Sequence, residues 1–504
     1  MGSYVQQIIN RQRVGESIRN MADLQLLPTE ETSGTHLHFP NEVLLLIFGY
    51  SRKEELKKIR RASKTCNVLA TPLLFDDIYI SVHQKDLEVF TNITQSPHLS
   101  QSIRRLIYDT STFTSGSGKE WYVKQVLQQV SYLLWNFGRG HEYKNADEQI
   151  NELLKAAHPV KLPEYEMRQT ERKLLSYRII NRGYEAYQTK AKEQRENEKG
   201  ELVARLCLGL ERLHNLKAVS FEYEWASQAR NPKFGVETAL APLFLEGSPL
   251  SRSYHPLYLR PTTTEPPTHP SPLFVAFPTI MRALALTGKE ITRLEYADPH
   301  GIADYVFDSK ASMNAGLLQH TIGAVKHVRH LKIGLHAMDT VELKSANTMP
   351  DILRSMADLE DLQINVNASD RDDLIPYSIS DIFGRTPFTW PRLVSLDLQY
   401  FACSQTELLR FLRLQHKLRD LHLEGMEMAD GQGADTFDDL RKLPLLKAFS
   451  VTYPLRDDGG VDLWDCEERG SEMEAALEKY VLKRSEENPL RKKSVAEIET
   501  DSDD

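Results

Sequence analysis

The chain has 504 residues, of which 41% are hydrophobic and 26% are charged, as in an ordinary globular protein. This length suggests roughly three domains, or one elongated repeat domain with an attached module. A net charge of -9 and a pI near 6.0 argue against a general nucleic-acid binder, because that class presents a basic face.

The cysteines and the N-terminus indicate a reducing compartment. Cys66, Cys207, Cys403 and Cys466 are too far apart for a CxxC pair and too few for a disulfide scaffold. The opening MGSYVQQIINRQRVG lacks a signal-peptide pattern, and Gln6 stands where a myristoylation motif needs Ser or Thr. No apolar run approaches the ~20 residues of a membrane span. We expect a cytoplasmic and/or nuclear protein without membrane contact, in which residues 1–36 are a flexible segment.

The first strong pattern is FPNEVLLLIF, which starts at Phe39. Pro40 suits a first helical position because the N–H it lacks would have no partner there. Asn41 and Glu42 place acceptors near the positive end of the helix dipole. The run from Val43 to Phe48 is apolar nearly all round, which predicts burial on every side. In so short a segment, part of that burial must come from another domain or another protein.

Two further short helices are expected after this run. In the basic stretch that follows, Leu56 and Ile59 share one face, with Ala62 and Ser63, while Lys and Arg occupy the other. A third helix is expected from Lys64 to Ala70, ended by Pro72. About forty residues in three helices is very small for an independent core.

These segments together, F-P-N-E-V-L-L-L-I-F and then E-L-K-K-I-R-R-A-S-K-T-C-N-V-L-A, resemble an F-box over residues 37–80. The following T-P-L-L-F-D-D-I-Y-I-S matches the way such modules lead into a strand. The resemblance implies docking on the Skp adaptor subunit of a cullin–RING ubiquitin ligase. It implies that the adaptor-binding residues are Pro40, Leu44, Ile47, Phe48, Leu56 and Ile59. The alternative is a plain helical hairpin that belongs to the main fold.

The region after this module mixes strand, helix and loop patterns. Residues Ile103 to Tyr108 predict a strand, and apolar residues from Tyr122 to Leu134 recur at helical spacing. We expect a helical insertion over about 119–210. The prolines between about 227 and 278 predict a long loop, because proline at that density breaks regular elements.

One short pattern, apolar-x-x-apolar-x-apolar, recurs from Ile103 to Val451. Its last members begin 25 to 34 residues apart. Each copy alternates as a strand does, and helical patterns lie between copies. A strand and a helix at this period are typical of leucine-rich repeats, here irregular because the regular Asn ladder is missing. We expect an α+β or α/β solenoid over residues 81–465. The competing architecture is a doubly wound α/β sheet. The copies begin at Ile103, Leu216, Ile291, Val328, Leu359, Leu393, Leu418 and Leu446.

Strand alternation also predicts which side chains face outward. If the apolar positions point into the core, the residues between them form a polar concave face suited to binding a target protein. The expected target-binding residues are Lys332, Gln363, Asn365, Asp397, Gln399, His422 and Glu424, with Ser450 and Thr452 at the end of the same face.

We find no pattern for catalysis, a metal or a cofactor. His320, His327, His330 and His336 gather in one stretch, but no Glu stands between them as in HExxH. The Gly-rich turns fit neither a P-loop nor GxGxxG, and there is no GxSxG. Residues 466–504 are mostly charged, which predicts a largely disordered tail.

The sequence therefore predicts a substrate-recognition subunit of an SCF-type ubiquitin ligase. The F-box would bind the Skp adaptor, the repeats would bind an unknown protein target, and the cullin–RING partners would supply the chemistry. The alternative is a repeat scaffold for protein–protein interaction without a ligase role, in which the N-terminal helices cap the repeats. An enzyme is the least favoured class.

Overall fold

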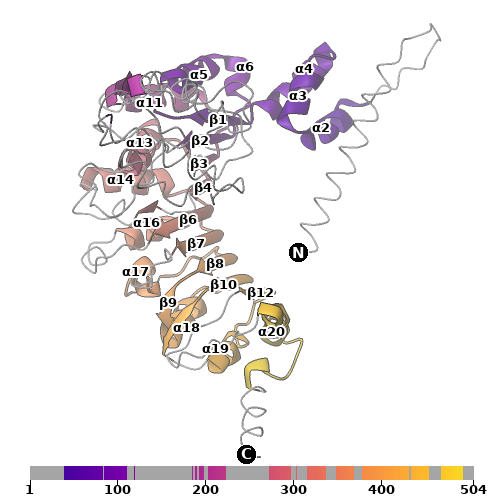
Figure 1. The fold of residues 1–504 in the computed structure, drawn as a ribbon, viewed down its shortest axis with the longest axis vertical. Coiled ribbons are helices and arrows are strands. Elements are labelled where there is room, and N and C mark those ends of the chain that lie inside the picture. Colours follow the sequence, from indigo (N-terminus) through magenta and orange to yellow (C-terminus); the bar gives the residue numbers. More distant parts are fainter. Residues whose placement is uncertain are drawn as a thin grey trace, which may run out of the picture.

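The computed structural model describes residues 39–82, 84–109, 119, 184–185, 188–189, 192–193, 195–197, 202–222, 272–296, 302–303, 315–336, 348–367, 377–386, 388–430, 433–452 and 467–491. The segment 1–36, most of the helical insertion, the Pro-rich loop up to residue 271 and residues 492–504 lie outside this set. Within it, the chain forms one long parallel sheet with helices along it and a small helical module at the N-terminal end (Figure 1).

The described strands form a ten-stranded sheet whose order follows the chain. All neighbouring strands described in this sheet pair in parallel. A doubly wound sheet reverses its order at a switch point, so the described strands exclude that architecture. The main path comprises β1 (Asp77–Ile80), β2 (Arg105–Asp109), β3 (Ala218–Glu222), β4 (Arg293–Tyr296), β6 (His330–His336), β7 (Asp361–Asn367), β8 (Ser395–Gln399), β10 (Asp420–Glu424) and β12 (Ala448–Thr452), and β5 (Ile302–Ala303) pairs with β6.

The recurring sequence pattern coincides with the register of this sheet. The middle apolar residue of each copy pairs with the middle residue of the next, which confirms that the copies are equivalent units. The side chains of this ladder are buried, because they face the helices that connect the strands. The ladder runs through Leu106, Val219, Leu294, Leu331, Leu362, Leu396, Leu421 and Phe449.

The described helices between the strands stack in chain order along one side of the sheet (Figure 1). They are α5 (Gln84–Gln95), α6 (Pro97–Ser100), α11 (Leu202–Arg212), α13 (Pro272–Thr287), α14 (Ala315–Val325), α16 (Met349–Ser355), α17 (Ile379–Phe383), α18 (Gln405–Arg413) and α19 (Gly433–Leu440). A second, two-stranded parallel sheet joins β9 (Ala402–Ser404) and β11 (Glu427–Asp430).

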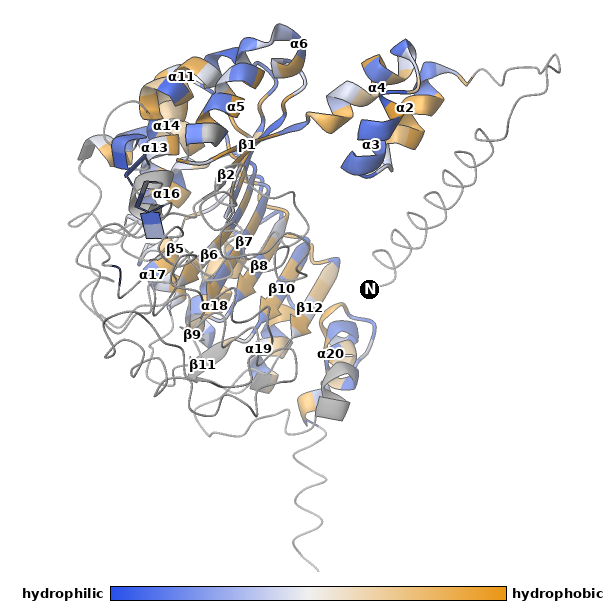
Figure 2. Ribbon diagram, turned by 45° about the horizontal axis from the view of Figure 1, so that its top comes forward, coloured by the Kyte–Doolittle hydropathy of each residue, from blue (hydrophilic) through white to orange (hydrophobic). Residues whose placement is uncertain are grey.

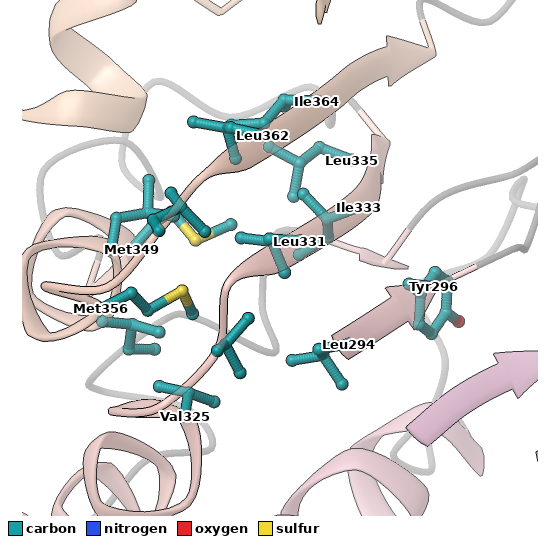
Figure 3. Close-up of a cluster of buried hydrophobic side chains, with 14 of the residues drawn as sticks. Leu294, Tyr296, Val325, Leu331, Ile333, Leu335, Met349, Met356, Leu362 and Ile364 are labelled. Carbon is teal, nitrogen blue, oxygen red and sulfur yellow. The ribbon is translucent and has the colours of Figure 1, made fainter. Parts of the chain in front are cut away.

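The core lies between the strands and this row of helices. Figure 3 shows how one unit packs on the next: Leu331 and Leu362 on neighbouring strands lie near Met349, from α16, and Met356, just beyond it. All four side chains are buried. One continuous apolar cluster runs from Ile78 in β1 to the C-terminal units. Each unit therefore completes its core only by stacking on its neighbours.

The N-terminal module consists of α2 (Asn41–Gly49), α3 (Lys53–Ile59) and α4 (Lys64–Leu74). The second helix ends at Ile59, so Ala62 and Ser63 do not share its face as predicted. Ser63 caps α4 by accepting a hydrogen bond from the Cys66 N–H at 3.0 Å. The prediction that Pro72 ends the third helix is wrong. The helix continues to Leu74 because Ala70 and Leu74 are buried, and the Pro72 ring faces solvent.

Two boundaries near the C-terminal half also differ from expectation. The Pro-rich loop was expected to reach about 278, but α13 begins at Pro272 and contains Pro278, because this stretch buries Phe277, Ile280 and Met281 against the sheet. The expected disordered tail is wrong for Glu467–Val481, which form α20.

Helix α20 packs against β12, the last strand of the sheet. Leu477, Tyr480 and Val481 join the main core. Arg441 fixes this contact by donating to the backbone oxygens of Tyr480, at 2.7 Å, and Ser485. The helix protects a strand edge that would otherwise be open to pairing. None of the described helices is both long enough and apolar enough to cross a membrane.

Candidate functional site

The N-terminal module has a core of its own, separate from that of the sheet. Phe48 and Leu56, two of the six residues expected to contact an adaptor, are only 5% and 2% exposed. They pack with Ala70 and Leu74. Direct adaptor contact stays a prediction for both, and in the structure their side chains hold the three helices together.

The other four predicted residues are accessible to different degrees. Pro40 is exposed at the start of α2, whereas Leu44, Ile47 and Ile59 are half-buried against the small core. Each half-buried side chain keeps some surface open to solvent. These four residues therefore remain candidate contacts for an adaptor.

A set of large apolar side chains on the same module is more exposed than the predicted ones. Leu46 is 62% exposed and Val68, on α4, is 59% exposed. The exposed residues on or just after α2 are Val43, Leu45, Leu46 and Tyr50, and we call them the exposed apolar face. Figure 2 shows α2 as largely hydrophobic beside the hydrophilic α3. The unbroken run VLLLIF is the sequence signal for this surface, since three helices of this size cannot cover both sides of it.

Ion pairs attach this module to the sheet. Lys53 of α3 contacts Asp76 at 3.0 Å and Asp77 at 2.9 Å, and Arg105 of β2 donates to Asp77 at 2.9 and 3.0 Å. Burial raises the pKa of the Asp77 carboxyl, but the hydrogen bonds from Arg105 and Lys53 outweigh it and lower the pKa below its usual value. Phe75 adds an apolar link because it contacts both cores.

The second candidate surface is the face of the sheet opposite the helices, which we call the open face. Lys332 is exposed, and the other predicted residues alternate with buried neighbours along their strands, as expected. Gln399 is the exception, at 9% exposure, because its neighbours cover it. The half-buried members are Gln363, Asn365, Asp397, His422 and Glu424.

Five of the seven predicted residues gather into one group through hydrogen bonds and the ion-pair contacts of His422, and we call this group the polar cluster: Asn365, Asp397, Gln399, His422 and Glu424. Asn365 donates to Gln399 at 2.5 Å, and Gln399 donates to both oxygens of Asp397 at 3.0 and 3.2 Å. The Nε2 atom of His422 lies 3.9 Å from Asp397 and 3.5 Å from Glu424. The cluster spans β7, β8 and β10, at a spacing of about 4.8 Å per strand. Lys332 and Gln363 lie beside it.

Burial gives Asp397 an unfavourable environment for its charge. It raises the pKa of the Asp397 carboxyl above its ordinary value, and the negative charge of Glu424 acts in the same direction. The hydrogen bond from Gln399 and the charges of His422 and Lys332 oppose the rise without cancelling it. The site is therefore rich in acceptors and short of positive charge.

Two residues that sequence reasoning missed position Glu424. Tyr400 donates its hydroxyl to Glu424 at 2.9 Å and adopts a φ of 63°, which a non-glycine residue rarely does. Gly425 has a φ of 56°, and a Cβ there would lie 2.5 Å from the Tyr400 ring. A tyrosine just after a strand gives no sequence signal for a turn with positive φ, so the sequence did not reveal the role of Tyr400.

The histidine-rich stretch does not gather into a site. His327 lies 3.5 Å from Glu290, and His330 lies 3.7 Å from Asp361 on the neighbouring strand. No group of three or more His, Cys, Asp or Glu side chains within the described ranges has a geometry that could hold a metal ion.

Comparison of the sequence with protein-family models and with curated proteins returns no match. The two surfaces therefore have to be interpreted from their own chemistry.

Proposed function

We propose that this protein is the substrate-recognition subunit of an SCF-type ubiquitin ligase and that its N-terminal module is an F-box that docks on the Skp adaptor. The exposed apolar face carries the proposal. Leu45, Leu46 and Tyr50 lie in or just after one nine-residue helix and are 40%, 62% and 52% exposed. Grouped apolar side chains on a module with only a small core favour a protein partner.

The second part of the proposal concerns the sheet. We interpret its stacked strand–helix units as irregular leucine-rich repeats, whose open face receives the target. The polar cluster supports this because its half-buried donors and acceptors suit a protein surface. The protein would act in the cytoplasm or nucleus by proximity, holding the target beside enzymes that its partners supply.

A repeat scaffold in which the N-terminal helices cap the sheet is the second candidate function. The separate cores weigh against it, because a cap completes the core it covers. Replacing Leu56 with alanine separates the two. Loss of so buried a leucine costs about 2–5 kcal/mol, more than a core of this size tolerates. A docking module would then unfold and lose adaptor binding while the main unfolding transition stays in place. A cap would lower the main transition as well.

The proposal is tested with the full-length chain and the purified Skp adaptor. Leu46→Asp places a charge in the exposed apolar face without touching the small core. We expect the wild type to retain the adaptor and Leu46→Asp to lose it. Val89→Asp is the matched control, since Val89 is a 37% exposed apolar residue on α5, outside the module. Equal retention by all three proteins would remove the F-box assignment.

A further inference from the structure

Two carboxylates on the open face have an arginine beside them. Asp77 contacts Arg105 at 2.9 Å, and Glu295 contacts Arg293 at 2.5 Å. Asp397 and Glu424 differ. Within the part of the chain that the structure describes, neither has a Lys or Arg within 4.0 Å, and their shared ion-pair partner is His422. We call these two residues the carboxylate pair.

The carboxylate pair is open to a ligand from solvent. The side chains of Asp397 and Glu424 are 22% and 20% exposed. Asp397 is the register partner of His422, and Glu424 is the partner of Gln399, so the two carboxylates lie diagonally across neighbouring strands. At a strand spacing of about 4.8 Å, one planar cation can reach both.

We infer that the carboxylate pair receives the side chain of an arginine or lysine from an extended segment of the target protein. This inference rests on the proposed function, because it names the chemistry of the segment that the open face would recognise. A carboxylate only accepts hydrogen bonds, whereas a guanidinium or ammonium only donates them, so the two are complementary. Partial burial strengthens such a contact compared with one in water.

The two aspartates on this face show what is missing. Asp77, which accepts hydrogen bonds from Arg105 and Lys53, has a lowered pKa. Asp397 has no Lys or Arg within 4.0 Å among the described residues, and its burial raises its pKa despite the charges of His422 and Lys332. A cation bound beside Asp397 would remove this difference. A metal ion is the poorer candidate, since the described residues present no group of three ligands with suitable geometry.

The surroundings favour a polypeptide over a small amine. Gln363 lies beside Asp397 in register, and Ser450 and Thr452 lie beside His422 and Glu424 on the other side. Gln363 offers an amide on one side of the carboxylate pair. On the other side, Thr452 carries a hydroxyl, and the Ser450 hydroxyl forms a hydrogen bond of 2.7 Å with His422 Nδ1. Peptide groups need both donors and acceptors of this kind, so an extended segment with one basic residue at its centre fits the surface.

The test is a selection of peptides from a random 12-residue phage-displayed library by the full-length protein. We expect Arg or Lys to be enriched in peptides selected by the wild type and not in those selected by the double variant Asp397→Asn, Glu424→Gln. These amides keep an acceptor for Gln399 and for Tyr400. Asp420→Asn is the control, because Asp420 lies on β10 but is exposed and outside the polar cluster.

The best wild-type peptide is then titrated by fluorescence polarisation. We expect the double variant to weaken binding about tenfold, and Asp420→Asn to change it less than about twofold. Replacing the peptide's basic residue with citrulline, or with norleucine in the case of lysine, should weaken binding to the wild type equally. It should cause no further loss with the double variant. This peptide-side change needs no protein variant to fold.

A selection without basic enrichment, or with no peptide recovered, overturns the inference, as does unchanged affinity on either side. The adaptor pull-down distinguishes this failure from that of the proposed function. Adaptor retention without a basic preference overturns the inference alone. A basic preference without adaptor retention overturns the ligase role and leaves the carboxylate pair as a binding site.

Discussion

Replacing Gly209 with alanine should destabilise the first units of the sheet. Gly209 lies in α11, and a Cβ at this position would be 2.2 and 2.4 Å from two ring atoms of Phe90 in α5. Carbon atoms pack at about 3.5–4.0 Å, so the ring would have to retreat by more than about 1 Å. Phe90 is 0% exposed, which leaves it no open space. Overpacking of this kind costs about 1–3 kcal/mol.

The opposing term is the better helix propensity of alanine, about 1 kcal/mol over glycine. Gly323 in α14 isolates that term, since a Cβ there meets only the Ala285 Cβ at 3.9 Å. Gly323→Ala should therefore gain up to about 1 kcal/mol. Gly209→Ala should lose up to about 2 kcal/mol after this offset.

The two variants are compared by thermal unfolding of the full-length chain. A change of 1 kcal/mol shifts the midpoint by about 2–4 °C for a large domain. We expect Gly209→Ala to unfold at a lower temperature than the wild type and Gly323→Ala at an equal or higher one. A midpoint for Gly209→Ala as high as that of Gly323→Ala would show that α5 and α11 do not pack as described.

Three further changes have distinct expected outcomes. Asp77→Asn should lower the free energy of unfolding in urea by about 1 kcal/mol at pH 7. The difference from the wild type should vanish as the pH falls through the folded pKa of Asp77, which lies below the ordinary 3.8. A difference that does not change with pH would contradict the ion pairs. Asp397→Asn should be at least as stable as the wild type at pH 7. The pKa of Asp397 is raised in the folded protein, so the wild type loses stability as the pH rises from 3.8 through the folded pKa, and the variant does not. A variant that is less stable at pH 7 would contradict this sign. Arg441→Ala should cost about 1.5–3 kcal/mol and increase hydrogen exchange in α20, and unchanged exchange would show that Arg441 does not hold that helix.

The repeat pattern predicted the sheet and the side chains of its open face. An apolar-x-x-apolar-x-apolar copy has one way of burying its residues in a strand, so alternation alone places Asp397, His422 and Glu424 on the same face. Their convergence into the polar cluster needed the register between strands, which depends on loop lengths and packing that alternation does not contain.

The N-terminal helix shows the opposite case. Since residues 43–48 are all apolar, helical periodicity gives no phase, and the sequence could not tell that Phe48 turns inward while Leu46 turns outward. In α20, the buried Leu477 and Tyr480 are surrounded in the sequence by charged residues, a composition that predicts a disordered tail. Its stability comes from distant partners such as Arg441, which no local pattern reveals.

The most direct measurement of the central claim is photo-crosslinking from the exposed apolar face. A benzophenone amino acid is placed at Leu46 in the full-length chain, and at Val89 in a control chain, and each protein is irradiated with the purified Skp adaptor. The account predicts a covalent adduct with the adaptor from position 46 and none from position 89. Adducts of equal yield from both positions, or none from position 46, would contradict it.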